Sequence, residues 1–437
     1  MSDRCHIDLT QPALRALGPY LVLRMALALI AGALLSGCGT TFTSRNVFFG
    51  EQRGNHVASG GEADVIRLYF DRQGALYPDV QVPIADSELR MTRDQSLMEY
   101  FLRSNSTCSA GNDWTGVRRS LCQLPQTEAG RRVEAWRAVQ DELFTEAART
   151  VRERLSAKPR PLFVLIHGYR VADAESDYRK VRAKVTAHPN SGVPLFLQVH
   201  WDGLKSPTPA FAWSRAQANG FLVGLSLRRV LKNLSEITQV RVMTHSSGAF
   251  VFAATVGDPG AVFGALGNES TEYREFRENA SGSDRFPIPR NADLRAAMVV
   301  PATPPESFAG GPHAHKEEKA LHHHAGVLAP VRLIIGANPR DFGVTKAILP
   351  GNWSLLGSSS LGTSFNYFCG LRDAVLSRQG SAVPKPLLVD MRSPEHKKVL
   401  LWDEHAWTEY LHHAPMNRLL DLLLDAVPGA GDERCLE

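Results

Sequence analysis

The chain has 437 residues, of which 43% are hydrophobic and 22% charged, and its formal net charge at pH 7 is +4. This length suffices for one large domain or two ordinary ones, and the composition is that of a soluble globular protein. Because the net charge is small for the length, it gives no reason to expect nucleic acid as a partner.

The first segment, residues 1–37, is a predicted lipoprotein signal peptide. Arg15 and Arg24 precede the uncharged run "MALALIAGALL", which is too short to span a bilayer and is typical of the apolar part of a signal. The following "LSGC" resembles the bacterial lipobox, in which the Cys thiol is acylated, so we expect Cys38 to carry a lipid anchor. An ordinary secretory signal or a buried helix is the alternative, and Met25 is an alternative start.

A polar, Gly-rich tether is predicted over residues 38–60. By resemblance to bacterial lipoproteins, Gly39 rather than Asp after the Cys indicates the outer membrane of a Gram-negative cell, facing the periplasm. Stable attachment there requires more than one acyl chain.

The chain has six cysteines, and setting aside the first two leaves four, which allow three pairings. An oxidising periplasm permits disulfides. We favour Cys108 with Cys122, which flank one loop, and by default Cys369 with Cys435. Free buried thiols are the alternative, above all for the second pair.

Residues 61–158 are predicted to form an N-terminal appendage. The stretch "ADVIRLYFDRQGALYPD" has strand character around a Gly-containing turn. Residues 126–156 are dense in helix formers, with apolar residues at steps of three and four, which predicts an amphipathic helix.

The sequence pattern changes in residues 159–428, where short apolar runs alternate with predicted helical stretches such as 209–234. Continuous apolar runs without alternation are typical of parallel strands covered on both faces. We therefore predict a mostly parallel, doubly wound α/β sheet, closed by a helix that opens at Pro415. Two polar insertions, 257–293 and 302–329, are candidate lids. The apolar runs are 161–168, 194–201, 239–246, 294–302, 331–337 and 385–391.

Ser246 is the candidate nucleophile. It lies in "THSSG" between an apolar run and a small-residue helix, which is the setting of a nucleophile elbow, the sharp turn from a strand to a helix. Gly248 supplies the small residue that such a turn needs, and His245 precedes the serine. Thr244 stands where the elbow pattern usually has Gly.

Two backbone N–H groups are candidates for an oxyanion hole, the pair of donors that stabilises negative charge on the reacting carbonyl oxygen. One belongs to Ser247, directly after the nucleophile, and the other to Tyr169 in the "HGY" loop that ends an apolar run. The His167 side chain is expected to be a structural hydrogen bonder rather than a base.

Asp341 and His405 are the candidate acid and base, each following an apolar run. A serine hydroxyl needs a His to take its proton and an acid to orient that His. The chain order Ser246, Asp341, His405 is that of the α/β-hydrolases. The rival bases are His412 and His413, beside the start of the last helix where an imidazolium is disfavoured, and His396 in a polar stretch. The rival acids are Asp390 and Asp403.

Over about residues 160–425 the chain resembles the bacterial α/β-hydrolases grouped as domain of unknown function 900. The resemblance rests on "VLIHGY", "VHWDG", "SRAQANG", "THSSG", "ANPRD" and "DEHAWTEYL". It implies an α/β-hydrolase fold, with Thr244 and Glu404 as departures from the family pattern. Matching positions are His167 to Tyr169, Trp201, Ser214 with Ala216, His245 to Gly248, Asp341 and His405.

These motifs predict a serine hydrolase of the esterase or lipase type that acts on small-molecule or lipid esters without a cofactor. The choice between esterase, lipase and thioesterase stays open, as does the oligomeric state. The alternative is a non-catalytic envelope lipoprotein that uses the same fold to bind a partner or a lipid. A solvated loop is favoured over a zinc or nickel site for the stretch that contains His313, His315, His322, His323 and His324.

Overall fold

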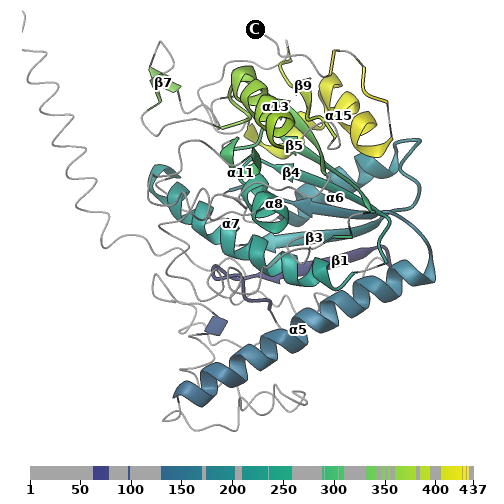
Figure 1. The fold of residues 1–437 in the computed structure, drawn as a ribbon, viewed down its shortest axis with the longest axis vertical. Coiled ribbons are helices and arrows are strands. Elements are labelled where there is room, and N and C mark those ends of the chain that lie inside the picture. Colours follow the sequence, from purple (N-terminus) through teal and green to yellow (C-terminus); the bar gives the residue numbers. More distant parts are fainter. Residues whose placement is uncertain are drawn as a thin grey trace, which may run out of the picture. The chain divides into compact units, whose positions relative to one another are not determined.

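Among the described residues, seven strands form one all-parallel sheet, seen in the computed structural model of Figure 1. Its order is β1-β3-β2-β4-β5-β6-β9. The strands are β1 (Val65–Phe70), β2 (Leu162–Ile166), β3 (Leu195–Trp201), β4 (Gln239–His245), β5 (Asp293–Val299), β6 (Val331–Ala337) and β9 (Leu387–Asp390). The structure describes residues 63–77, 97–98, 129–169, 174–201, 209–234, 236–257, 288–289, 291–303, 305–309, 331–341, 347–349, 353–354, 360–379, 384–393, 405–425, 427–429 and 431–432.

The prediction of a parallel, doubly wound α/β sheet is confirmed, because each of the six apolar runs coincides with one of β2 to β6 or β9. These runs do not alternate because both faces of each strand are covered. Along β2, Leu162, Val164 and Ile166 join one hydrophobic cluster, while Phe163 and Leu165 join another.

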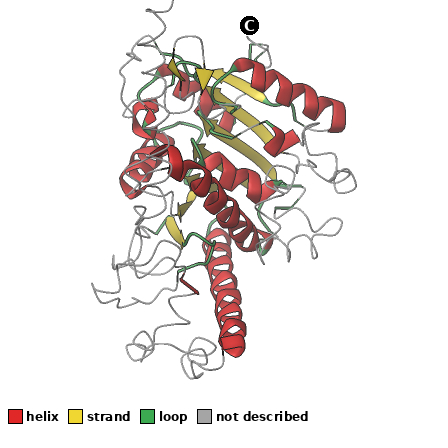
Figure 2. Cartoon of the chain, turned by 90° about the vertical axis from the view of Figure 1, so that its left-hand side faces the viewer, coloured by secondary structure: helices red, strands yellow, loops and turns green. Residues whose placement is uncertain are grey.

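Helices cover both faces of the sheet, as Figure 2 shows edge-on. One face packs against α5, α7, α8, α11 and α13, and the other against α6, α14 and α15. A small antiparallel pair, β7 (Ala347–Leu349) and β8 (Trp353–Ser354), follows β6 and was not predicted. The helices are α5 (Ala129–Ala157), α6 (Ala174–Thr186), α7 (Pro209–Lys232), α8 (Gly248–Val256), α11 (Glu306–Ala309), α13 (Phe365–Gln379), α14 (Trp407–Tyr410) and α15 (Ala414–Leu424).

The described part of residues 61–158, expected to be an appendage, supplies an edge strand to the same sheet. β1 pairs in parallel with β3, and α5 follows as the predicted long helix. Gln140 on α5 accepts a hydrogen bond from the Leu76 N–H (2.8 Å) and donates one to the Leu76 carbonyl (3.0 Å), which ties the helix to the turn after β1. Trp136 on α5 joins the same hydrophobic cluster as β1.

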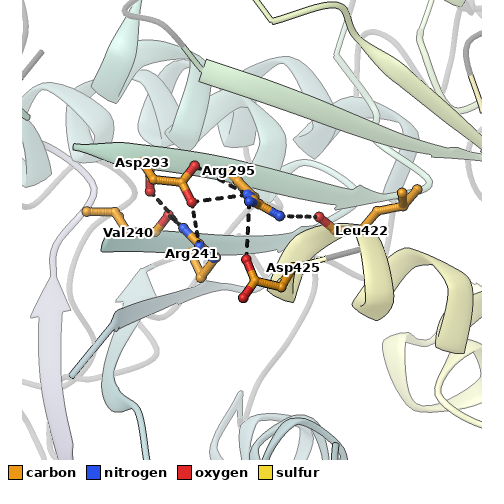
Figure 3. Close-up of polar contacts among 6 residues, drawn as sticks. All are labelled: Val240, Arg241, Asp293, Arg295, Leu422 and Asp425. Carbon is orange, nitrogen blue, oxygen red and sulfur yellow. Dashed lines mark hydrogen bonds and ion pairs between the residues drawn. The ribbon is translucent and has the colours of Figure 1, made fainter. Parts of the chain in front are cut away.

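A charged cluster fastens the end of α15 to the amino ends of β4 and β5 (Figure 3). Asp293 accepts hydrogen bonds from the guanidinium groups of Arg241 (2.6 Å) and Arg295 (3.3 Å). Arg295 also donates to the Leu422 carbonyl (3.2 Å) and to Asp425 (3.4 Å). Guanidinium donors at the last carbonyls of a helix satisfy groups that have no partner inside the helix.

Several predictions concern residues outside the described ranges. They are the signal 1–37, the tether 38–60, Cys38, Cys108, Cys122, Cys435 and nearly all of the two insertions. Cys369 lies on α13 and the other cysteines lie outside those ranges, so both pairings stay predictions. Within the described part of the chain, no helix is long and apolar enough to cross a membrane.

Candidate active site

The candidate site residues come from the carboxyl ends of three strands. Tyr169 follows β2, Ser246 follows β4, and Asp341 follows β6. Because the strands are parallel, these ends share one edge of the sheet, where ligands bind in open α/β folds. His405 reaches this edge from the segment before α14.

Ser246 occupies a strained turn between β4 and α8. Its φ of +50° lies in the left-handed region, which is uncommon for a residue other than glycine. The turn is held from both sides, because the Ser246 N–H donates to the Val299 carbonyl (3.0 Å) and the Ser246 carbonyl accepts from the Ala302 N–H (3.1 Å). Val300 next to it has a φ of +41°, so backbone strain gathers where β4 and β5 end.

Two glycines let the turn and the loop after β2 approach closely. A Cβ at Gly248 would lie 2.6 Å from the carbonyl oxygens of both Ile166 and His167. A Cβ at Gly168 would lie 3.0 Å from the Ser246 Cβ. Side chains at either position would push the two segments apart.

Thr244, the departure from the usual elbow pattern, still belongs to β4. It lies between Ile166 of β2 and Met298 of β5 and is fully buried. Its Oγ1 makes no hydrogen bond with any described residue. The close backbone approach between the serine turn and the loop after β2 is at Gly248.

Three side chains far apart in the sequence meet in a line. His405 Nε2 lies 2.8 Å from Ser246 Oγ, and His405 Nδ1 lies 2.8 Å from Asp341 Oδ2. Ser246 and Asp341 are almost fully buried, whereas the His405 side chain is 16% exposed. With Nδ1 protonated toward the carboxylate, Nε2 is free to accept the serine proton.

Asp341 stays ionised despite its burial. Burial alone would raise the pKa of this carboxyl, but the charge and hydrogen bond of His405, together with a hydrogen bond from Tyr410, lower its pKa below the ordinary value. An ionised acid at Nδ1 fixes the tautomer of His405 and stabilises an imidazolium there.

His167 is structural, as expected. Its Nδ1 lies 2.8 Å from the Gly168 carbonyl, and its Nε2 accepts from the backbone N–H of Trp201, the last residue of β3 (3.1 Å). Burial lowers the pKa of His167 to about 4, so the ring is neutral. The Tyr178 hydroxyl accepts from the His167 N–H (2.9 Å), which holds the loop after β2 in place.

His245 and Trp407 form the wall behind His405. The His245 ring lies 4.8 Å from that of His405 and stacks on Trp407 at 5.7 Å, between centroids. Burial, followed by the charge of His405, lowers the pKa of His245 well below its usual value. Because its pKa is lowered, His245 is too weak a base to compete with His405 for the serine proton.

The two candidate oxyanion donors lie beside the turn. Ser247 is fully buried at the N-cap of α8, and its N–H makes no hydrogen bond with any described residue. Tyr169 follows Gly168, which approaches Ser246 closely. Their backbone positions thus flank the serine.

The rival acids and bases lie elsewhere or outside the described residues. Asp390 ends β9 and is paired with Arg392 (2.9 Å). His413 is the N-cap of α15, and His412 is exposed beside it. Asp403 lies outside the described ranges.

Two other possible sites are a cavity and a metal site. A cavity of about 450 Å³ opens at the amino edge of the sheet, and its lining includes Arg152, Arg160 and Glu236 but none of Ser246, Asp341 and His405. Within the ranges that the structure describes, no three His, Cys, Asp or Glu side chains gather to hold a metal. The five histidines of 302–329 lie outside those ranges, so the loop prediction stays untested.

No family model, no curated protein and no solved structure matches the chain. The family resemblance therefore stays a prediction. The described part of the chain has a seven-stranded parallel α/β fold, whose strand order is compatible with that of the α/β-hydrolases.

Sequence reasoning did not find Tyr410, Asn338 and Trp407. The Tyr410 hydroxyl donates to Asp341 Oδ2 (2.5 Å), and Asn338 Nδ2 donates to the Tyr410 hydroxyl (3.0 Å). Asn338 lies in "ANPRD" and the other two residues lie in "DEHAWTEYL", so all three are sequence neighbours of the candidate acid or base. That nearness was the only available signal, because neither stretch contains a pattern that reveals contacts across about 70 residues.

Proposed function

We propose that the chain is a serine hydrolase of carboxylic esters with an α/β-hydrolase fold, anchored in the bacterial envelope through a lipid on Cys38. One observation carries the proposal: Ser246, His405 and Asp341 form a hydrogen-bonded line with both contacts at 2.8 Å. The φ of +50° at Ser246 supports it further, because the nucleophile elbow is a strained turn.

In the proposed reaction, His405 Nε2 takes the proton of Ser246 as Oγ attacks the acyl carbon of the ester. The backbone N–H groups of Ser247 and Tyr169 stabilise the oxyanion. His405 then returns the proton to the leaving alkoxide, and water releases the acyl group by the same steps. Asp341 remains ionised throughout and holds the imidazole.

The non-catalytic alternative would require neither a strained serine nor an aligned base. Both features favour catalysis over a binding role of the same fold. The site does not distinguish an esterase from a lipase or a thioesterase.

The test is labelling of the purified chain with a fluorophosphonate probe, which phosphonylates activated serines. We expect the wild type to be labelled and Ser246→Ala to remain unlabelled. Ser226→Ala is the matched control, since Ser226 is a buried serine on α7 away from the site. An unlabelled wild type, or a labelled Ser246→Ala protein, would refute the proposal.

A further inference from the structure

A chain of hydrogen-bonded polar groups connects Asp341 to Tyr410 and Asn338. Asp341 Oδ2 lies 2.8 Å from His405 Nδ1 and accepts a hydrogen bond from the Tyr410 hydroxyl at 2.5 Å. The Tyr410 hydroxyl in turn accepts a hydrogen bond from Asn338 Nδ2 at 3.0 Å. The Asn338 Oδ1 accepts from the Arg340 backbone N–H at 3.0 Å.

The chemistry of these groups fixes the direction of every proton. The Arg340 N–H can only donate, so it orients the Asn338 amide with its oxygen toward residue 340 and its NH₂ group toward Tyr410. The phenol oxygen then accepts from Asn338, and its own proton is left for the Asp341 carboxylate. A carboxylate with a donor of this kind does not rotate freely.

The polar groups of this network are buried. Asn338, Asp341 and Tyr410 are each at most 1% exposed. The Asp341 N–H also donates to the Asn338 carbonyl (3.0 Å), so acid and amide belong to one closed turn after β6. In a buried network each hydrogen bond is stronger, and a lost partner is not replaced by water.

We propose that Tyr410 and Asn338 are positioning residues that hold Asp341 Oδ2 opposite His405 Nδ1 through this fixed series of hydrogen bonds. The inference rests on the proposed function, because it gives Tyr410 a role through the acid of the line Ser246–His405–Asp341. Tyr410 lies five residues after His405, so one short segment carries both the candidate base and the residue that positions the acid.

Tyr410→Phe is the primary test, because it removes the hydroxyl and keeps the buried ring. We expect the second-order rate of fluorophosphonate labelling to fall about tenfold, as befits the loss of a hydrogen bond to a charged group. Thr255→Val on α8 is the matched control. It removes a buried hydroxyl that donates to the Val251 carbonyl (2.7 Å) away from the site. This variant should lose stability and keep its labelling rate.

A double-mutant cycle separates positioning from general support of the fold. If Tyr410 acts through Asp341, Tyr410→Phe should slow labelling by less than about twofold in an Asp341→Ala background. Residual reactivity of a serine without its acid makes this background measurable. A spectroscopic readout accompanies the cycle: the downfield proton resonance of His405 Nδ1–H should broaden in Tyr410→Phe and remain sharp in Thr255→Val.

The outcomes are distinct. Equal slowing in both backgrounds, or labelling of Tyr410→Phe at the wild-type rate, would overturn the positioning role and leave the proposed function standing. A wild type that is not labelled would overturn the proposed function and, with it, the role of Tyr410.

Discussion

Gly248 sets how closely the serine turn approaches the loop after β2, and Gly248→Ala tests this. The new Cβ would lie 2.6 Å from the carbonyl oxygens of Ile166 and His167. Carbon–oxygen contacts in proteins lie at about 3.3 Å or more, so the turn would have to retreat by roughly 0.7 Å. Overpacking of this kind costs about 1–3 kcal/mol of stability. A displacement near 1 Å costs on the order of 100-fold in rate when it separates a nucleophile from its donors.

The assay combines fluorophosphonate labelling rates with urea denaturation. We expect Gly248→Ala to be labelled at least about tenfold more slowly and to unfold at lower urea. Gly370→Ala is the matched control, because a Cβ there on α13 meets no atom within 4 Å. It should gain up to about 1 kcal/mol of helix stability and keep its labelling rate. A Gly248→Ala protein with wild-type rate and stability would refute the close approach.

Two further predictions concern the buried rings near the site. The pKa of His167 is about 4 when folded and near 6.5 when unfolded, so its stabilising contribution is present above pH ~6.5 and is lost as the pH falls toward 4, by up to about 3 kcal/mol. Urea denaturation at both pH values should therefore show a smaller loss in His167→Asn than in the wild type; equal losses would contradict this. Trp407→Ala should cost about 3–5 kcal/mol, because the indole is buried and stacks on His245. Trp407→Phe should cost much less, since the indole Nε1 makes no hydrogen bond with any described residue, and similar losses in thermal unfolding would count against the stacking role.

The strands could be predicted because their signal is local. In β2, every residue is buried on one face of the sheet or the other, and the sequence is correspondingly apolar without a break. The helices α5 and α15 could be predicted equally well from their composition. For α15, Pro415 in the first turn also indicated where the helix begins. Such patterns depend on neighbours within a few residues.

The order of the strands and the contacts behind the acid could not be predicted. β1 pairs with β3, which lies about 130 residues further along the chain, and nothing in "VIRLYF" specifies that partner. Tyr410 and Asn338 are 72 residues apart and meet only because α14 and the turn after β6 pack at one edge. The candidate nucleophile, acid and base were found because their residue types and chain order follow known chemistry, whereas a tyrosine behind an acid has no such signature.

The long separations within the site bear on how the protein is made. Ser246 and His405 are 159 residues apart, and the segment with His405 is followed by α15, whose end docks on β5 through Asp425 and Arg295. Contacts of such separation form late, because the chain between them must be ordered first. Under the proposed function, a nascent or partly exported chain therefore carries an inert serine. Its reactivity would begin only when His405 has reached Ser246.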